Sequence, residues 1–222
     1  MTPLMSNVYI AIAGNISAGK STLTKVLAEK FQAKPIFEPV SENPYLADFY
    51  KDMKRYAFHS QMFFLSQRLK DQLSLSKEKG IFIQDRTIYE DAEIFARNLY
   101  ETGYIEKRDW DVYQSFYQTI SELLPTPDLI IYLKNSVPTL KKRIEKRGRK
   151  FEQKIDDTYL LDLNRLYNEW ADSFSNEKTK KIPFLTISMD KSNYLNDSKE
   201  LDRIIGLINN KMGGSPATLG FE

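Results

Sequence analysis

The sequence predicts an α/β fold, with one parallel sheet of five strands flanked by helices. Two observations predict it. Short apolar segments that end in polar residues occur five times, and segments with helical spacing separate them. The first apolar segment is followed at once by a glycine-rich turn, which then opens a helix. Strands that alternate with helices are joined by right-handed crossovers, and these place the strands in parallel with helices on both faces.

The turn after the first strand carries the most specific motif. Residues 14–21 match G-x-x-x-x-G-K-S without a gap, the pattern of a phosphate-binding loop (P-loop). Its glycines let successive backbone N–H groups point at one phosphate, while Lys20 neutralises the outer phosphates and the Ser21 hydroxyl can bind Mg²⁺. A chance match is the alternative, but the flanking strand (8–13) and helix are the context that the motif requires. The chain is therefore expected to bind a nucleoside triphosphate.

The other elements follow from the apolar spacing. Further strands are predicted at 36–37, 81–83, 129–133 and 184–187, each a short apolar run of the kind found in buried parallel strands. One helix is predicted to begin near Ser136. The residues that recur at helical spacing elsewhere are Leu23, Val26, Leu27 and Phe31; Phe58, Met62, Leu65, Leu69 and Leu73; Ile94, Phe95 and Leu99; and Tyr113, Phe116, Tyr117 and Ile120.

Charged side chains follow two of these strands. Glu38 ends the second strand, and Asp85 and Arg86 end the third. Ligands of parallel sheets bind beyond the carboxyl ends of the strands, so these groups are expected to meet the phosphate loop in one cleft. Glu38 is then a candidate general base for an acceptor hydroxyl, and Asp85 a candidate to hold Mg²⁺ through water. Each carboxylate could instead be a helix cap or a surface acid.

A basic cluster follows the helix that starts near Ser136. Arg143 and Arg147 lie one helical turn apart, and Gly148 separates Arg147 from Arg149. Gly148 would permit a mobile lid that carries Arg149 over the phosphates. The alternative is a solvated basic helix end that the macrodipole stabilises. Because a phosphate loop is present, the lid is the favoured interpretation.

Composition narrows the class further. We expect one domain over residues 1–212 and a disordered tail over 213–222, because no linker or repeat divides the 222 residues. The 32 basic and 30 acidic residues nearly balance, so no nucleic-acid partner is expected. The absence of cysteine excludes disulfides and thiolate zinc sites. Without a membrane-length apolar run or a signal peptide, a cytoplasmic enzyme is expected.

Several motifs in order resemble the deoxyribonucleoside kinases, the family of deoxycytidine, deoxyguanosine and bacterial deoxyadenosine kinases. The resemblance extends from Tyr9 to about Ile208 and is strongest to bacterial deoxyadenosine kinase. It implies a P-loop kinase fold with an arginine-rich lid, ATP as phosphate donor with Mg²⁺, a deoxynucleoside as acceptor and a homodimer. The motifs are Gly14-Asn15-Ile16-Ser17-Ala18-Gly19-Lys20-Ser21-Thr22, Glu38-Pro39-Val40, Phe49-Tyr50, Gln61 to Arg68, Asp85 to Asp91, and Arg147-Gly148-Arg149.

The resemblance also implies roles for single residues. Glu38 matches the base for the nucleoside 5′-OH, Arg86 the arginine beside that oxygen, and Asp85 the neighbouring acid, which we expect at the metal with Ser21. The residues that match sugar and base contacts are Tyr50 and Glu152 for the 3′-OH, Gln61 for the base edge, Phe95 for packing on the base, and Arg68 with Asp91 for the base pocket. Arg147 and Arg149 match the lid arginines, and Arg143 a residue near the donor adenine. The segment Asp190 to Tyr194 is the candidate donor-base loop.

The base preference follows from the Arg68–Asp91 pair. A thymine methyl group beside an ion pair is unfavourable, so thymidine should be a poor substrate. The segment Glu42-Asn43-Pro44-Tyr45 resembles the bacterial purine enzymes, so we expect deoxyadenosine first, deoxyguanosine second and deoxycytidine third. A thymidylate-kinase-like monophosphate kinase is the nearest alternative, but Phe37 stands where that class usually has an arginine. A nucleotide-dependent switch is less consistent with the sequence, because Asp-x-x-Gly and Asn-Lys-x-Asp are both absent.

One surface expectation concerns the helix with Trp110, Tyr113, Phe116 and Tyr117. These rings exceed what one helix face against a small sheet needs, so we expect some of them to pair two subunits. The alternative is that they complete the core of one chain.

Overall fold

The computed structural model describes residues 7–75, 78–153, 155–176 and 182–213. Its centre is a parallel sheet of five strands in the order β2-β3-β1-β4-β5. In this sheet Val8 lies opposite Ile81, and Ile10 lies opposite Leu129. The strands are β1 (Val8–Ala13), β2 (Lys34–Ile36), β3 (Ile81–Asp85), β4 (Leu129–Lys134) and β5 (Phe184–Ser188).

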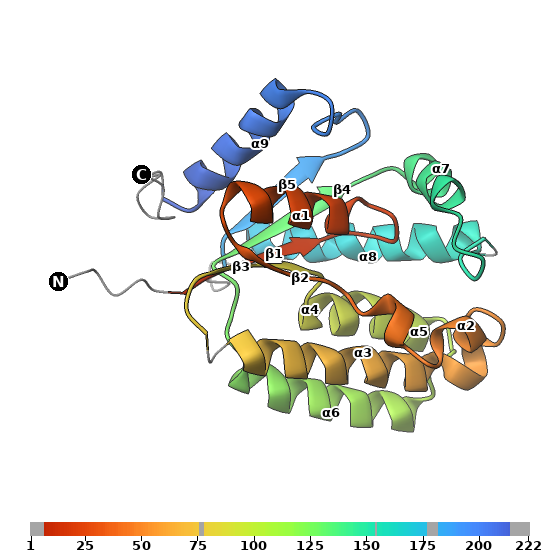
Figure 1. Ribbon diagram of the computed structural model, residues 1–222. Helices are drawn as coiled ribbons and strands as arrows, with labels where there is room; N and C mark the ends of the chain where they lie inside the picture. The colour runs from red at the N-terminus through yellow and green to blue at the C-terminus, as the bar shows by residue number, and fades with distance from the viewer. Residues whose placement is uncertain (1–6, 76–77, 154, 177–181, 214–222) are drawn as a thin grey trace.

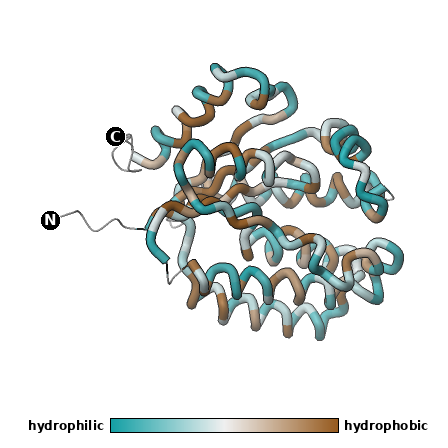
Figure 2. The backbone as a smooth tube through the Cα atoms, in the orientation of Figure 1, coloured by the Kyte–Doolittle hydropathy of each residue, from teal (hydrophilic) through white to brown (hydrophobic). Residues whose placement is uncertain are grey.

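Helices cover both faces of the sheet, as the alternating pattern predicts (Figure 1). One face packs against α1 (Lys20–Lys30) and α9 (Ser198–Lys211). The other face is covered by α3 (Met53–Leu75) and α8 (Asp157–Asn176), and α6 (Lys107–Leu123) packs against α3 on its outer side (Figure 1). The shorter elements are η1 (Val40–Glu42), α2 (Leu46–Phe49), α4 (Ile88–Glu90), the π-helix η2 (Asp91–Ala96), α5 (Arg97–Glu101) and α7 (Val137–Arg147). Figure 2 shows the apolar residues gathered on the strands and on the helix sides that face them.

The central strands carry continuous apolar runs before their polar carboxyl ends because both of their faces are covered. Ile10, Ala11 and Ile12 of β1 are fully buried, as are Leu129 and Ile130 of β4. The edge strand β2 is shorter than its neighbours. It ends at Ile36, so Phe37, predicted as the last residue of this strand, lies outside it and is 46% exposed.

Two helices differ from the expectation. The segment around Ile94 and Phe95 lies partly in the π-helix η2, a wider turn that is often found near functional sites. Leu73, predicted on the buried stripe of α3, is 45% exposed. Of the predicted stripe only Leu65 is fully buried, because the face of α3 that turns inward carries Gln61, Phe64, Arg68 and Gln72 instead.

Two of the four α6 rings predicted to pair subunits, those of Tyr113 and Tyr117, belong to the core of one chain, whereas Trp110 and Phe116 are half-buried, so a subunit surface on this helix stays a prediction. Tyr113 is fully buried and Tyr117 nearly so. Trp110 stacks on Tyr100 with ring centroids 4.9 Å apart, and it also stacks on Tyr113. The exposed apolar residues of this helix are instead Val112 and Leu123.

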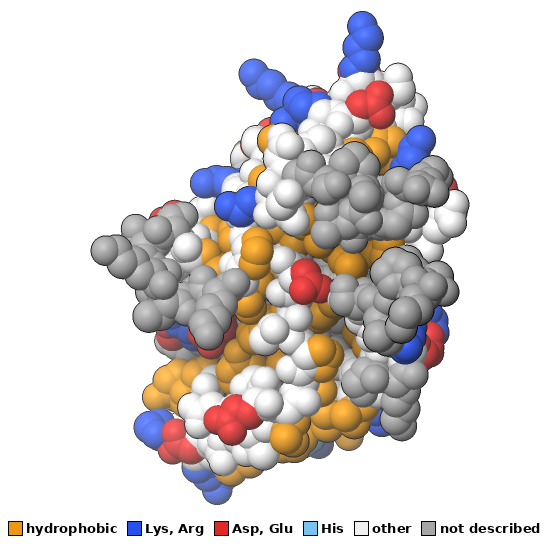
Figure 3. All heavy atoms as spheres, turned by 90° about the vertical axis from the view of Figure 1, so that its left-hand side faces the viewer, with side chains coloured by type: hydrophobic (Ala, Val, Ile, Leu, Met, Phe, Trp, Pro, Cys, Tyr) orange, Lys and Arg blue, Asp and Glu red, His pale blue; other side chains and the backbone are white. Residues whose placement is uncertain are grey.

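The carboxyl ends of the strands are the functional end of the sheet. β1 leads into the phosphate loop, and β3 ends at Asp85. On the face in Figure 3, which lies at the amino ends, the described lysine and arginine side chains stand at the margins and form no single patch. Within the described ranges, none of the helices has the length and apolar character to cross a membrane. The tail predicted over 213–222 lies outside the described residues except for Gly213.

Candidate active site

The phosphate loop has the backbone geometry that its glycines predict. Gly19 has φ +102°, a conformation that favours glycine, and α1 begins directly after it at Lys20. A Cβ atom on Gly14 would lie 2.9 Å from the Cβ of Ala18 and 3.1 Å from the carbonyl oxygen of Leu133, so only glycine fits there. The N-terminus of α1 therefore points its free N–H groups and positive dipole end into a cavity that Lys20 and Ser21 line.

Lys20 reaches back across this loop. Its Nζ donates a hydrogen bond to the carbonyl oxygen of Asn15 at 3.1 Å, and the side chain is buried. Burial, together with the positive charge of Arg86, lowers the pKa of Lys20 to about 8. A phosphate beside this ammonium would favour the charged form. The Asn15 amide, by contrast, turns toward α8 and donates to Asn164 Oδ1 at 2.7 Å.

Ser21 and Asp85 form the pair of oxygens that suits a magnesium ion. The Ser21 hydroxyl donates to Asp85 Oδ2, and Asp85 Oδ1 is buried with no hydrogen-bond partner among the described residues. Mg²⁺ prefers oxygen ligands and is commonly held by one or two protein groups together with phosphates and water. The two side chains therefore fit the ion that the phosphate-loop motif implies.

The opposite wall of the cavity is a network of buried ion pairs. Glu38 Oε1 accepts a hydrogen bond from Arg68 Nη2 at 3.0 Å and forms an ion pair with Arg86 Nη1 at 3.3 Å. Burial by itself raises the pKa of Glu38, but the two guanidinium groups outweigh it and hold that pKa below its usual value. Glu38 is therefore a charged carboxylate at neutral pH, able to accept a hydrogen bond from a hydroxyl group.

Arg68 has a second partner deeper in the wall. Its Nε donates to Asp91 Oδ2 at 3.3 Å, and both side chains are buried. Burial raises the pKa of Asp91 to about 6, although Arg68 opposes this change. The sequence motifs predict the Arg68–Asp91 pair but not the contact of Arg68 with Glu38. No local spacing reveals that contact, because Arg68 lies on α3 and Glu38 follows β2.

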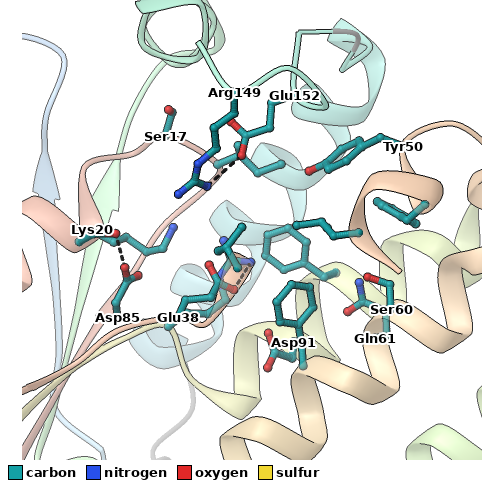
Figure 4. Close-up of a pocket in the computed structure, with 18 of the residues that line it drawn as sticks. Ser17, Lys20, Glu38, Tyr50, Ser60, Gln61, Asp85, Asp91, Arg149 and Glu152 are labelled. Atoms are coloured by element: carbon teal, nitrogen blue, oxygen red, sulfur yellow. Dashed lines mark hydrogen bonds and ion pairs between the residues drawn. The ribbon is translucent and has the colours of Figure 1, made fainter. Parts of the chain in front are cut away.

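These groups line one cavity with an empty volume of about 760 Å³, part of it open to solvent. The predicted acceptor-side residues all lie on its wall: Glu38, Tyr50, Gln61, Asp85, Arg86, Asp91, Phe95 and Glu152, with Arg68 buried directly behind Glu38 and Asp91. Figure 4 shows Lys20 and Asp85 at one end, Gln61 and Asp91 at the other, and Glu38 between them. The Gln61 carbonyl oxygen is buried and has no partner among the described residues. Arg86 packs over the Phe95 ring, 4.0 Å from its centroid.

The two arginines predicted to belong to a lid, Arg147 and Arg149, line this cavity. α7 ends at Arg147, and Gly148 follows with φ +71°. Arg147 Nη2 donates to Glu152 Oε2, and Arg149 Nη1 donates to Glu152 Oε1 at 3.1 Å. Glu152, predicted to bind the sugar 3′-OH, thus holds both of these arginines and faces Tyr50 across the cavity (Figure 4).

A second cavity, of about 1340 Å³, adjoins the outer side of the phosphate loop. Its wall includes Gly19, Thr22, Arg143, residues 192–194 of the segment predicted as the donor-base loop, and the following Leu195. Arg143 is fixed there, because its Nη1 donates to the carbonyl oxygen of Ala18 at 2.9 Å and its Nη2 to that of Met189 at 2.9 Å. Gly14 and Asn15, the first two residues of the phosphate loop, line neither cavity.

Comparison with known proteins agrees with this geometry. The sequence pattern of the family described as deoxynucleoside kinase matches residues 10–212. The chain belongs to the deoxynucleoside kinase family. It is therefore an enzyme of that family, and its activity is the phosphorylation of a deoxynucleoside.

Individual relatives cover almost the whole chain. It is 36% identical over 204 residues to the deoxyadenosine/deoxycytidine kinase of Bacillus subtilis (strain 168), covering 91% of this chain and 92% of the relative. It is 38% identical over 200 residues to the deoxyguanosine kinase of the same bacterium, covering 88% and 93%. The structure of deoxyadenosine kinase from M. mycoides with bound dATP superposes with a TM-score of 0.77 at 33% identity, covering 90% of this chain and 98% of that one.

Proposed function

We propose that this kinase transfers the γ-phosphoryl group of ATP to the 5′-OH of a purine deoxynucleoside in nucleoside salvage. The observation that carries the proposal is one cavity with a phosphate loop at one end and a charged, buried Glu38 opposite it. The preferred order is deoxyadenosine, then deoxyguanosine, then deoxycytidine. The kinase relatives named above act on these same three bases, which supports the class of substrate.

The donor phosphates would occupy the loop. Backbone N–H groups at the start of α1 and the Lys20 ammonium would bind their oxygens, and the helix dipole would favour their charge. Magnesium, held by Ser21 and through water by Asp85, would neutralise charge on the β- and γ-phosphates. Arg143 and residues 192–195 would border the donor adenine.

Glu38 would accept the proton of the 5′-OH as that oxygen attacks the γ-phosphorus. The bond from the γ-phosphorus to the bridging oxygen of ADP breaks as the new bond forms, so the products are ADP, the 5′-monophosphate and a proton on Glu38. Arg86, 3.3 Å from Glu38, would hold the attacking oxygen in line. Arg147 and Arg149 would leave Glu152 in part and bind the transferring phosphoryl group as the lid closes.

The sugar and base would fill the rest of the cavity. Tyr50 and Glu152 would bind the 3′-OH, and Phe95 would pack on the base. The free carbonyl oxygen of Gln61 can accept a hydrogen bond from the adenine amine, while the amide group donates to a ring nitrogen. The buried Arg68–Asp91 pair would oppose the thymine methyl group.

We also propose that the chain forms a homodimer through helices, as its family resemblance implies. The exposed apolar residues Val112 and Leu123 of α6 and Leu73 of α3 support this proposal. Sedimentation at micromolar protein concentration tests it: we expect a dimer, and a monomer would contradict the proposal.

The decisive experiment is a coupled phosphorylation assay with Mg·ATP over the four deoxynucleosides and deoxythymidine monophosphate. We expect the highest kcat/KM with deoxyadenosine and none with the monophosphate. Activity on the monophosphate alone would favour the thymidylate-kinase-like alternative. A thymidine preference would contradict the proposed order and leave the reaction class in place.

A further inference from the structure

The proposed mechanism leaves one buried carboxylate without a role. Glu90, the last residue of α4, is fully buried beneath the phosphate loop. Its Oε1 accepts a hydrogen bond from the backbone N–H of Gly14 at 3.1 Å, and its Oε2 accepts one from the backbone N–H of Thr87 at 3.0 Å. A single side chain therefore bonds both to the first residue of the donor loop and to the turn that presents Arg86.

Tyr167 of α8 completes this arrangement. Its hydroxyl lies 2.7 Å from Glu90 Oε1 and 2.8 Å from the carbonyl oxygen of Gly14. The ring is fully buried and stacks on Tyr132 with centroids 5.4 Å apart and planes 5° from parallel. Because the ring is packed, the hydroxyl has little freedom to leave these two oxygens.

The acceptor side needs such a constraint. Arg86 has φ +69°, a left-handed conformation that a non-glycine residue keeps only when its surroundings impose it. Its N–H bonds to the carbonyl oxygen of Ile12 at 3.0 Å, and the next residue, Thr87, bonds to Glu90. The backbone is thus fixed immediately before and after the side chain that faces Glu38.

The donor side depends on the same group. Gly14 leaves no room for a side chain, because a Cβ atom there would collide with Ala18 and Leu133. Glu90 and Tyr167 bond to its N–H and its carbonyl oxygen from the other side. Both Arg86 and Lys20 also lie close enough to lower the pKa of Glu90, which burial raises. Glu90 therefore lies within electrostatic reach of both Lys20 and Arg86.

We propose that Glu90 and Tyr167 form a positioning pair that fixes the phosphate loop and the Arg86 turn at the separation that phosphoryl transfer requires. The proposal rests on the proposed function. Neither residue lines either cavity, so Glu90 acts through Gly14 and Thr87, and Tyr167 acts through Gly14 and Glu90. A misplacement of reacting groups by about 1 Å can lower a rate by about a hundredfold, so a fixed separation matters even far from the reacting atoms.

The test uses Glu90→Gln, Tyr167→Phe and their combination in the full chain. Glutamine keeps the volume, but its NH₂ group must face one of the two backbone donors, so one of the two hydrogen bonds is lost. We expect kcat with deoxyadenosine and Mg·ATP to fall about ten- to a hundredfold in Glu90→Gln. Tyr167→Phe loses one hydrogen bond and should lower kcat several-fold. Because the two residues act as one unit, the double variant should lose less than the product of the single losses.

Two further measurements separate positioning from stability. KM for each substrate should stay within about threefold of wild type, since substrate contacts are unchanged. A residue that only stabilises the fold would lower the melting temperature but leave kcat per folded molecule unchanged. Tyr132→Phe is the matched control: it removes a hydroxyl from the ring stacked on Tyr167, and that hydroxyl bonds to neither Glu90 nor Gly14 among the described contacts.

Unchanged kcat in both single variants, assayed below their melting temperatures, would overturn the positioning pair. If Glu90→Gln does not fold, Tyr167→Phe decides, because it keeps the carboxylate. The wild-type chain assayed in parallel separates the two proposals. A wild type inactive on every deoxynucleoside refutes the proposed function, whereas an active wild type with active variants refutes only the positioning pair.

Discussion

The two ends of the active-site cavity are built in opposite ways. The donor end is made by a short continuous segment, residues 14–21, whose backbone N–H groups and single lysine face the phosphate position. The acceptor end is made by side chains from separate elements, with Arg68 from α3 bonded to Glu38 after β2 and to Asp91 of η2. The geometry of a contiguous loop is set by its own backbone, whereas the acceptor network forms only when the fold brings its side chains together.

This difference has an energetic consequence. Backbone donors at the loop are independent of side-chain identity at most positions, so single substitutions there leave the other donors in place. At the acceptor end, buried charges depend on their partners, and removal of one leaves another unpaired in a low-dielectric site. We therefore expect acceptor-side substitutions to change turnover, stability and base preference together, and the following predictions test that contrast.

The largest effect should come from Glu38→Gln. Glutamine keeps the shape but cannot accept the proton of the 5′-OH, so kcat should fall on the order of 10²–10⁴-fold while nucleoside binding persists. Steady-state kinetics and calorimetric binding of deoxyadenosine measure the two quantities. Glu42→Gln, an exposed carboxylate in the neighbouring turn, is the control. A kcat within a few-fold of wild type would remove Glu38 from the mechanism.

The lid arginines should give the next largest effect, and they test the donor end. Arg147→Ala and Arg149→Ala should each weaken transition-state stabilisation by about 3 kcal/mol, on the order of a hundredfold in kcat. The exposed Lys150→Ala removes a neighbouring positive charge and should leave kcat near wild type. Normal kinetics in both arginine variants would indicate a solvated helix end that takes no part in transfer.

Asp91 should make stability depend on pH in the direction opposite to Glu38. The pKa of Asp91 is raised from 3.8 to about 6 in the folded chain, so its contribution to stability is fully present below pH 4 and is lost as pH rises to about 6. Relative to Asp91→Asn, the wild type should lose on the order of 2 kcal/mol of unfolding free energy over this range. Urea denaturation at several pH values measures it.

The pKa of Glu38 is lowered in the folded chain. Its contribution to stability is therefore present above the pKa that Glu38 has in the unfolded chain, and it is lost as pH falls.

The control for the Asp91 experiment is Asp111→Asn, on the exposed side of α6. If the difference between wild type and Asp91→Asn were flat from pH 4 to 6, the buried Arg68–Asp91 pair would be charged throughout, and burial would not dominate its chemistry.

The smallest effect should be on base choice. Arg68→Met with Asp91→Ala removes the ion pair and should raise thymidine activity relative to deoxyadenosine about tenfold, the scale of one unpaired pocket hydrogen bond. Because Arg68 also bonds to Glu38, kcat should fall for both nucleosides, so the ratio of kcat/KM values is the measurement. An unchanged ratio would show that this pair does not select the base.

Much of the fold followed from local patterns. The five strands and their parallel arrangement were predicted because apolar runs between helices have few other ways to be buried. The structure differs from the prediction where contacts with other segments determine burial: Phe37 lies outside β2 and is exposed, and Trp110 of α6 stacks on Tyr100 and Tyr113. No property of the isolated helix indicates which of its rings another segment will cover.

The sequence alone determined the donor loop, the family motifs and the grouping of Glu38, Asp85 and Arg86 at the strand ends. These features depend on short spacings, and spacing within a few residues fixes local backbone geometry. The tertiary structure alone decided that Arg68 joins Glu38 to Asp91 and that Glu90 and Tyr167 bond to Gly14. The physical reason is that ion pairs and hydrogen bonds act over about 3 Å in space, a distance that separation along the chain does not encode.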